Sequence, residues 1–119
     1  MSSITNPDMI EAKTCASIFT ELRLSAEQAG SIAALSKALG HPVRVQIVDV
    51  LRRYGGEVCV CDIERHFDLT QPTISHHLRV LREAGVIEGE QRGLWIYYRT
   101  VPEAVAPLAE LLSHLRSGI

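Results

Sequence analysis

The sequence lacks the features that mark several specialised classes of protein. Three cysteines in 119 residues are too few for the disulfide framework of a small secreted domain. No window approaches the roughly 20 consecutive apolar residues that a membrane helix requires, and neither end has the pattern of a signal peptide. Internal repeats and low-complexity tracts are also absent. We therefore expect one cytoplasmic domain, residues 1–119, that does not interact with membranes.

A strong basic excess is also missing, although such an excess is common in proteins that bind nucleic acid. The formal net charge is −2, and in the first thirty residues four acidic residues outnumber the two basic residues Lys13 and Arg23. Residues 70–99 are weakly basic, because Arg79, Arg82, Arg92 and Arg99 outnumber Glu83, Glu88 and Glu90. DNA binding through this segment requires two copies of it, so we expect a homodimer.

Apolar spacing and capping residues predict a mainly helical chain. The expected helices are 8–22, 25–39, 41–54, 60–67, 71–84 and 102–117, with a short extended piece at 57–60. The link between the fourth and fifth helices is so short that residues 60–84 predict a helix-turn-helix. The expected fold is mainly α with a small β-hairpin, a winged helix-turn-helix of the ααααββα type.

The hairpin expected at residues 86–99 is the wing of this fold. Its β-rich arms, 86–88 and 94–98, enclose 89–93, which we expect to be a mobile tip. Arg92 in that tip is a candidate for contact with the DNA backbone or minor groove. Strand alternation places Trp95 and Tyr97 on one face and Tyr98 on the other, and we expect these rings to anchor the wing to the core.

Both ends of the chain are predicted to support dimerisation. Residues 1–24 are expected to hold an N-terminal dimerisation and sensor helix. Residues 102–117 are expected to form a C-terminal dimerisation helix. Its apolar residues recur at spacings of four, three, four and three, the pattern of a helix pair: Val101, Val105, Leu108, Leu112 and Leu115.

The helix expected at 71–84 has the properties of a DNA recognition helix. Helical periodicity places His77 on the apolar side, packed against the domain, and His76 beside Arg79 on the polar side. There a ring nitrogen and a guanidinium can reach base edges or phosphates. Gln71 and Thr73 occupy the first turn, which a helix-turn-helix inserts into the major groove of double-stranded DNA.

The pair Cys59 and Cys61 is a candidate chelate for a soft metal ion. In extended backbone the side chains of residues i and i+2 share a face, whereas in a helix they lie about 200° apart. A disulfide between them would close a very small ring of poor geometry, which favours metal binding over a redox switch. An enzyme of the thiol oxidoreductase class is not expected, because the Cys-x-x-Cys spacing and an acid–base pair are absent.

The third thiol, Cys15, has two open interpretations. It lies on the apolar side of the first expected helix, so it is either core filler or a third ligand. Three thiolates suit pyramidal arsenic(III) or antimony(III), whereas cadmium, lead and zinc prefer a fourth donor. His66 is near enough in sequence to supply that donor, so both kinds of ion remain candidates.

Two segments resemble the ArsR/SmtB family of metal-sensing repressors. They are residues 57–63, Glu-Val-Cys-Val-Cys-Asp-Ile, and residues 71–85, Gln-Pro-Thr-Ile-Ser-His-His-Leu-Arg-Val-Leu-Arg-Glu-Ala-Gly. The likeness extends over about residues 31–115. It implies a dimer that occupies an operator until metal binding, with Cys59 and Cys61 among the ligands, lowers its affinity for DNA. It also implies an operator-facing set: Gln71, Thr73, Ser75, His76 and Arg79.

The sequence departs from the commonest arsenic-sensing pattern of this family in one respect. That pattern resembles Cys-x-Cys-x-x-Cys, and here Glu64 stands where the third cysteine would fall. Cys15 is the only replacement, as in family members that recruit an N-terminal thiol. The expected function is a repressor released by arsenic(III) or antimony(III) on Cys15, Cys59 and Cys61. The alternative is a cadmium-, lead- or zinc-responsive repressor that adds a fourth ligand to the cysteine pair.

Overall fold

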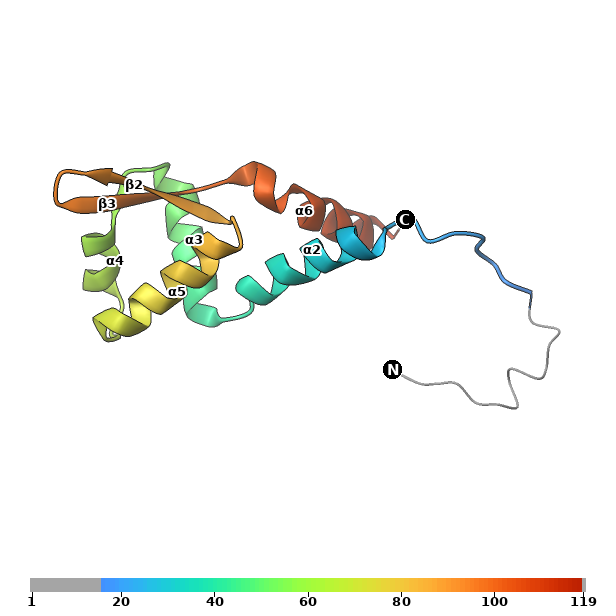
Figure 1. Ribbon diagram of the computed structural model, residues 1–119, viewed down its shortest axis with the longest axis horizontal. Coiled ribbons are helices and arrows are strands. Elements are labelled where there is room, and N and C mark those ends of the chain that lie inside the picture. The colour runs from blue at the N-terminus through green and yellow to red at the C-terminus, as the bar shows by residue number, and fades with distance from the viewer. Residues whose placement is uncertain (1–15, 119) are drawn as a thin grey trace.

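The computed structural model describes residues 16–118, and it confirms a mainly helical winged helix-turn-helix (Figure 1). Within that span no helix is both long enough and apolar enough to cross a membrane. The elements are α2 (Ala26–Ala38), α3 (Pro42–Tyr54), β1 (Val58–Cys59), α4 (Val60–His66), α5 (Gln71–Glu83), β2 (Ile87–Arg92), β3 (Trp95–Thr100) and α6 (Pro102–Ser117).

Local signals in the sequence account for where the helices begin and end. Ser25 and Gln28 form a capping box at the start of α2. At the start of α5, the hydroxyl of Thr70 accepts a hydrogen bond from the Thr73 amide at 3.3 Å. Gly55 ends α3 with a φ of 55°, a left-handed conformation that glycine adopts without steric cost.

The sheet has three antiparallel strands in the order β1-β3-β2. The extended piece expected at 57–60 is therefore its third strand, in which Cys59 pairs with Tyr97. This pairing joins the start of the helix-turn-helix to the wing. Cys59 is thus connected through its backbone to β3 as well as to α4.

The hairpin tip is shorter than the sequence predicted. Residues 89–93 were expected to form it, but β2 continues to Arg92 and only Gly93 and Leu94 separate the strands. Gly89 lies inside β2, where a Cβ atom would come within 2.9 Å of the side chains of Ile96 and Tyr98. This glycine therefore permits a close approach of side chains from β3 and does not form a turn.

One apolar core holds the helix-turn-helix and the sheet together. Ile47 and Leu51 of α3 are fully buried and meet the inward face of α5. That face is the one which helical periodicity predicted. Its buried residues are Ile74, His77, Leu78 and Leu81.

The prediction of a helix over 8–22 is wrong for its described part. Residues 16–24 are not helical, and the side chains of Ile18, Phe19 and Leu22 are 97%, 62% and 80% exposed. A short isolated helix is only marginally stable unless its apolar face packs against something, and a single copy of the chain covers little of this face. Cys15 and the rest of the expected helix lie outside the described residues.

Candidate nucleic-acid interface and thiol site

The outward face of α5 carries the polar side chains that the sequence predicted to face an operator. The expected operator-facing residues on α5 are all exposed: Gln71, Thr73, Ser75, His76 and Arg79. A guanidinium nitrogen of Arg79 lies 3.3 Å from Nδ1 of His76, so these two side chains form one polar patch. Both carry donors that suit base edges and phosphates.

His77, on the opposite face of α5, is 5% exposed, and it packs inward as predicted. Its Nδ1 accepts a hydrogen bond from Arg44 Nη1 at 3.1 Å, and its ring centroid lies 4.4 Å from that of His41. Burial lowers the pKa of His77, and the neighbouring positive groups His41, Arg44 and His76 lower it further. The neutral ring therefore connects the recognition helix to the start of α3.

The bond from Arg44 to His77 was not predicted. Helical spacing alone places Arg44 on the outward face of α3, yet its side chain is half-buried. Its Nε donates to the carbonyl of Ala38 at 2.6 Å, and its Nη1 bonds His77. Only the three-dimensional approach of α3 and α5 reveals this role.

Arg92 lies at the outer end of β2, but its guanidinium is bonded within the wing. Nη2 donates to the Glu90 carboxylate at 3.0 Å and to the Gly56 carbonyl at 3.4 Å, and the group stacks 4.5 Å from the centre of the Tyr97 ring. At the tip itself, Leu94 is 90% exposed. Contact between Arg92 and DNA therefore requires it to leave Glu90.

Of the aromatic residues expected to anchor the wing, Tyr98 has the buried position. It is 4% exposed, and its hydroxyl accepts a hydrogen bond from Arg82 Nη1 at 3.4 Å. Tyr97 is half-buried and contacts Arg92. Trp95, by contrast, is 48% exposed, so its anchoring role is not met in the single chain.

The thiol pair lies where an extended segment becomes a helix, as its spacing predicted. Cys59 is the N-cap of α4, with extended backbone at φ −78° and ψ 148°. Its Sγ accepts from the Cys61 amide at 3.3 Å, and Asp62 Oδ2 accepts from the Cys59 amide at 3.4 Å. Cys59 is buried, Cys61 is half-buried, and both are free thiols. This capping box fixes the two sulfur-bearing residues relative to each other.

The ionisation of Cys61 depends on its neighbours. A hydrogen bond with the Cys59 thiol, followed by burial and the negative charges of Cys59 and Asp62, raises the pKa of Cys61, while Arg65 acts in the opposite direction. Cys61 therefore favours its protonated form in the free protein. Metal binding to the Cys61 sulfur must release this proton, so it becomes stronger as pH rises.

A complete metal site is not assembled within residues 16–118. No group of three His, Cys, Asp or Glu residues converges there in a geometry that fits a metal ion. Nδ1 of His66, the expected fourth donor, lies 2.8 Å from the carbonyl of Asp62 on its own helix. The cysteine pair is therefore a partial site, and Cys15 lies outside the described residues.

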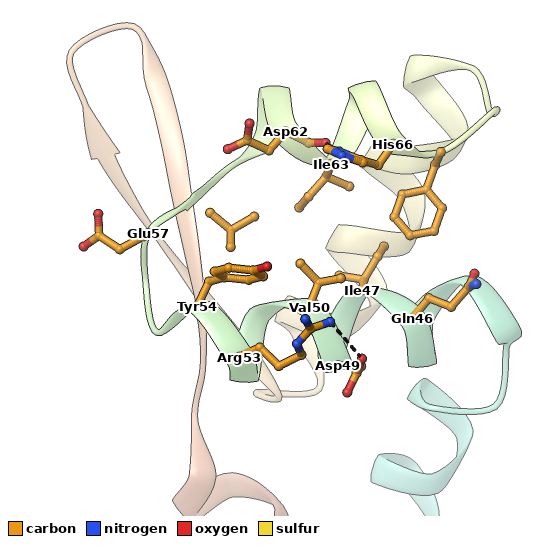
Figure 2. A pocket seen from close by; sticks show the side chains of 12 residues that line it. Gln46, Ile47, Asp49, Val50, Arg53, Tyr54, Glu57, Asp62, Ile63 and His66 are labelled. Atoms are coloured by element: carbon orange, nitrogen blue, oxygen red, sulfur yellow. Dashed lines mark hydrogen bonds and ion pairs between the residues drawn. The ribbon is translucent and has the colours of Figure 1, made fainter.

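A cavity of about 560 Å³ lies between α3 and α4 (Figure 2). Ile47 and Val50 of α3 line it on one side, and Ile63 of α4 lines it on the other, beside Asp62 and His66. All the described residues that line it fall within 46–67, and neither Cys59 nor Cys61 is among them. The cavity is therefore separate from the thiol pair.

Residues 41–88, from the start of α3 to the start of β2, match the family described as bacterial regulatory protein, arsR family. Among curated relatives, an HTH-type transcriptional regulator of Methanocaldococcus jannaschii is 37% identical, over 70% of this chain and 92% of its own. The arsenical resistance operon repressor of Escherichia coli is 40% identical, over 66% of each chain. A homolog of the cadmium resistance regulatory protein CadC in Staphylococcus aureus is 38% identical, over 66% of this chain and 64% of its own.

Solved structures agree with these relatives. The transcriptional repressor BigR of Xylella fastidiosa has a TM-score of 0.57 and 35% identity, covering 73% of this chain and 88% of that one. A homodimeric winged helix-turn-helix domain of Mycobacterium bovis has a TM-score of 0.62 and 29% identity, covering 84% and 91%. The family match and these relatives identify a DNA-binding transcriptional repressor and not an enzyme. The chain belongs to the arsR family of bacterial regulatory proteins.

Proposed function

We propose that the chain is a homodimeric repressor that arsenic(III) or antimony(III) releases from its operator when bound by Cys15, Cys59 and Cys61. The observation that carries this proposal is the position of two neighbouring thiols at the first turn of α4. That helix is the first of the helix-turn-helix, and only residues 67–70 separate it from α5. The two thiols supply two of the three sulfur ligands of a pyramidal ion.

The surface of the single chain supports a dimer. On α6, Leu112 and Leu115 are 53% and 68% exposed. In residues 16–24, which precede α2, the apolar side chains of Ile18, Phe19 and Leu22 are exposed as well. Scattered exposed apolar residues are normal, but a seam of them along one helix indicates a partner. The Mycobacterium bovis relative is described as homodimeric. A second copy also doubles the weakly basic DNA face.

The operator contacts follow from the outward face of α5. Gln71, Thr73 and Ser75 lie in its first turns, at the end that enters the major groove, and His76 and Arg79 follow one turn later. In the wing, Arg92 contacts the backbone or minor groove once it exchanges Glu90 for a phosphate.

Release is a linkage between two binding events. An ion that draws the Cys59 and Cys61 sulfurs together with a third ligand displaces the N-cap of α4, which is also paired with β3 of the wing. If the ion binds the displaced form more tightly, operator affinity falls by the same factor. Such couplings are commonly about 1–3 kcal/mol.

The alternative is a repressor that responds to cadmium, lead or zinc. The cysteine pair is compatible with it, and the Staphylococcus aureus relative is named for cadmium resistance. These ions require a fourth donor, which residues 16–118 of one chain do not bring to the pair. The alternative therefore depends on donors from another part of the chain or from a second copy.

The test is release from operator DNA titrated with arsenite, antimonite, cadmium, lead and zinc. Wild-type protein is compared with Cys15→Ser, Cys59→Ser and Cys61→Ser variants under reducing conditions. We expect all four proteins to bind the operator, and only the wild type to be released at low arsenite or antimonite. Release that persists in Cys59→Ser and Cys61→Ser refutes the thiol assignment. Release by divalent ions alone favours the alternative.

A further inference from the structure

We propose that Glu64 is a positioning residue that orients the carboxamide of Gln71 for reading a base in the major groove. This inference rests on the proposed role of α5 as the operator-facing helix. It concerns a side chain on α4 that is outside the proposed metal site and outside the operator-facing set. It also gives a function to Glu64, which stands where the third cysteine of the Cys-x-Cys-x-x-Cys pattern would fall.

The proposal is based on a hydrogen bond between the two helices of the helix-turn-helix. Nε2 of Gln71 donates to Oε2 of Glu64 at 3.0 Å. Glu64 is half-buried near the middle of α4, and Gln71 is the first, exposed residue of α5. The bond therefore runs from the supporting helix to the end of the helix that enters the groove.

The backbone at Gln71 is already fixed by other contacts. The Thr70 hydroxyl caps the helix by accepting from the Thr73 amide, and Pro72 presets the first turn. The remaining freedom lies in the Gln71 side chain, and it includes the rotation that exchanges the amide oxygen and nitrogen. The Glu64 carboxylate accepts hydrogen bonds only, so it selects the orientation with the nitrogen towards α4.

This orientation leaves the groups that adenine recognition needs. A carboxamide nitrogen carries two N–H donors, and Glu64 engages one of them. The second N–H and the amide oxygen form the donor–acceptor pair that matches N7 and N6 of adenine in the major groove. Fixing this pair before binding reduces the side-chain freedom lost when the complex forms.

The carboxylate has a second, opposing effect on DNA binding. Its negative charge lies beside the DNA face and repels phosphates on any sequence. Removing Glu64 should therefore raise affinity for random DNA slightly while weakening operator discrimination. A carboxylate that merely fills the surface of α4 would give the first effect without the second.

The experiment measures operator and scrambled-sequence affinity without any metal ion, for wild type, Glu64→Ala, Glu64→Gln and Gln71→Ala. We expect Glu64→Ala to reduce the ratio of operator to scrambled affinity by about tenfold, within the range for one bidentate base contact. Glu64→Gln keeps an acceptor oxygen and should restore most of the ratio. Gln71→Ala should lose at least as much as Glu64→Ala, and the double variant should lose little more than Gln71→Ala.

Several outcomes overturn the proposal. One is an unchanged ratio in Glu64→Ala, and another is a loss that Glu64→Gln does not repair. An unaffected Gln71→Ala also rejects it, because Gln71 then reads no base. The exposed acid Glu103 on α6 supplies the matched control, since Glu103→Ala changes the net charge equally and should leave the ratio unchanged. No metal is present, so a failure of metal-induced release is a separate result.

Discussion

The centre of the molecule and its two ends differ in how far they complete their own packing. In residues 42–100, Ile47, Leu51 and Leu81 are fully buried within a core shared by α3, α5 and the sheet. By contrast, α6 has no fully buried residue, and residues 16–24 expose most of their apolar side chains. The centre therefore completes its packing within one chain, whereas the ends leave apolar side chains exposed, as the proposed dimer requires.

The largest expected effect comes from removing a side chain at the centre. Ile47→Ala leaves a cavity where no solvent reaches, and we expect the free energy of unfolding to fall by about 2–5 kcal/mol. Denaturant unfolding at two protein concentrations measures it. The loss should be similar at both concentrations. A loss below about 1 kcal/mol would show that the centre is not a closed core.

A polar substitution on the exposed seam should act on association instead. Leu115→Glu removes an apolar contact from both copies. We expect a loss of about 1.5 kcal/mol of binding free energy at each of the two symmetric sites, so the dimer dissociation constant should rise by roughly one hundredfold. Sedimentation equilibrium measures this change. Glu110→Gln on the same exposed helix serves as a control. A Leu115→Glu protein that remains as dimeric as wild type would place the interface elsewhere.

A smaller effect is expected on the DNA-facing side of the centre. Arg79→Ala should weaken operator binding by about tenfold and reduce the dependence on salt concentration by about one phosphate contact. Arg52, on the outer face of α3, forms an ion pair with Asp49 at 2.9 Å and provides the matched control. Fluorescence anisotropy over a series of salt concentrations distinguishes the two variants. Equal losses in both would indicate a general charge effect.

The smallest effect concerns His77, where α5 meets α3. The folded protein holds the His77 pKa below the ordinary 6.5, so the unfolded chain binds this proton first as pH falls. Its contribution to stability is complete above 6.5 and decreases as pH falls through that value, by at most about 1.4 kcal/mol per pH unit. Unfolding of wild type and His77→Gln between about pH 7.5 and pH 5 tests this. A parallel decline in both proteins would assign the pH dependence to other groups.

The difference between centre and ends also explains what the sequence predicted. The helices α2 to α5 follow from caps such as Ser25, Thr70 and Gly55 and from the apolar period of α5, which are local signals. The helix expected over 8–22 was also periodic, but 16–24 are not helical in one chain. Periodicity identifies an apolar face without identifying the partner that covers it.

In the candidate site, too, some features were predictable from the sequence and others were not. The N-cap position of Cys59 and the exposed face of α5 were predictable from spacing, because each depends on residues close in sequence. The bonds from Arg44 to His77 and from Gln71 to Glu64 join different helices, so no local pattern contains them. The glycine at 89 was interpreted as part of a turn because its close contacts lie on the neighbouring strand.

The central claim is that the thiol pair at the start of α4 and the DNA face of α5 are coupled. It is tested most directly by measuring antimonite affinity for the free protein and for the protein saturated with operator DNA. Linkage predicts that operator weakens antimonite binding by the same factor as antimonite weakens operator binding. Equal antimonite affinity with and without operator would contradict the account.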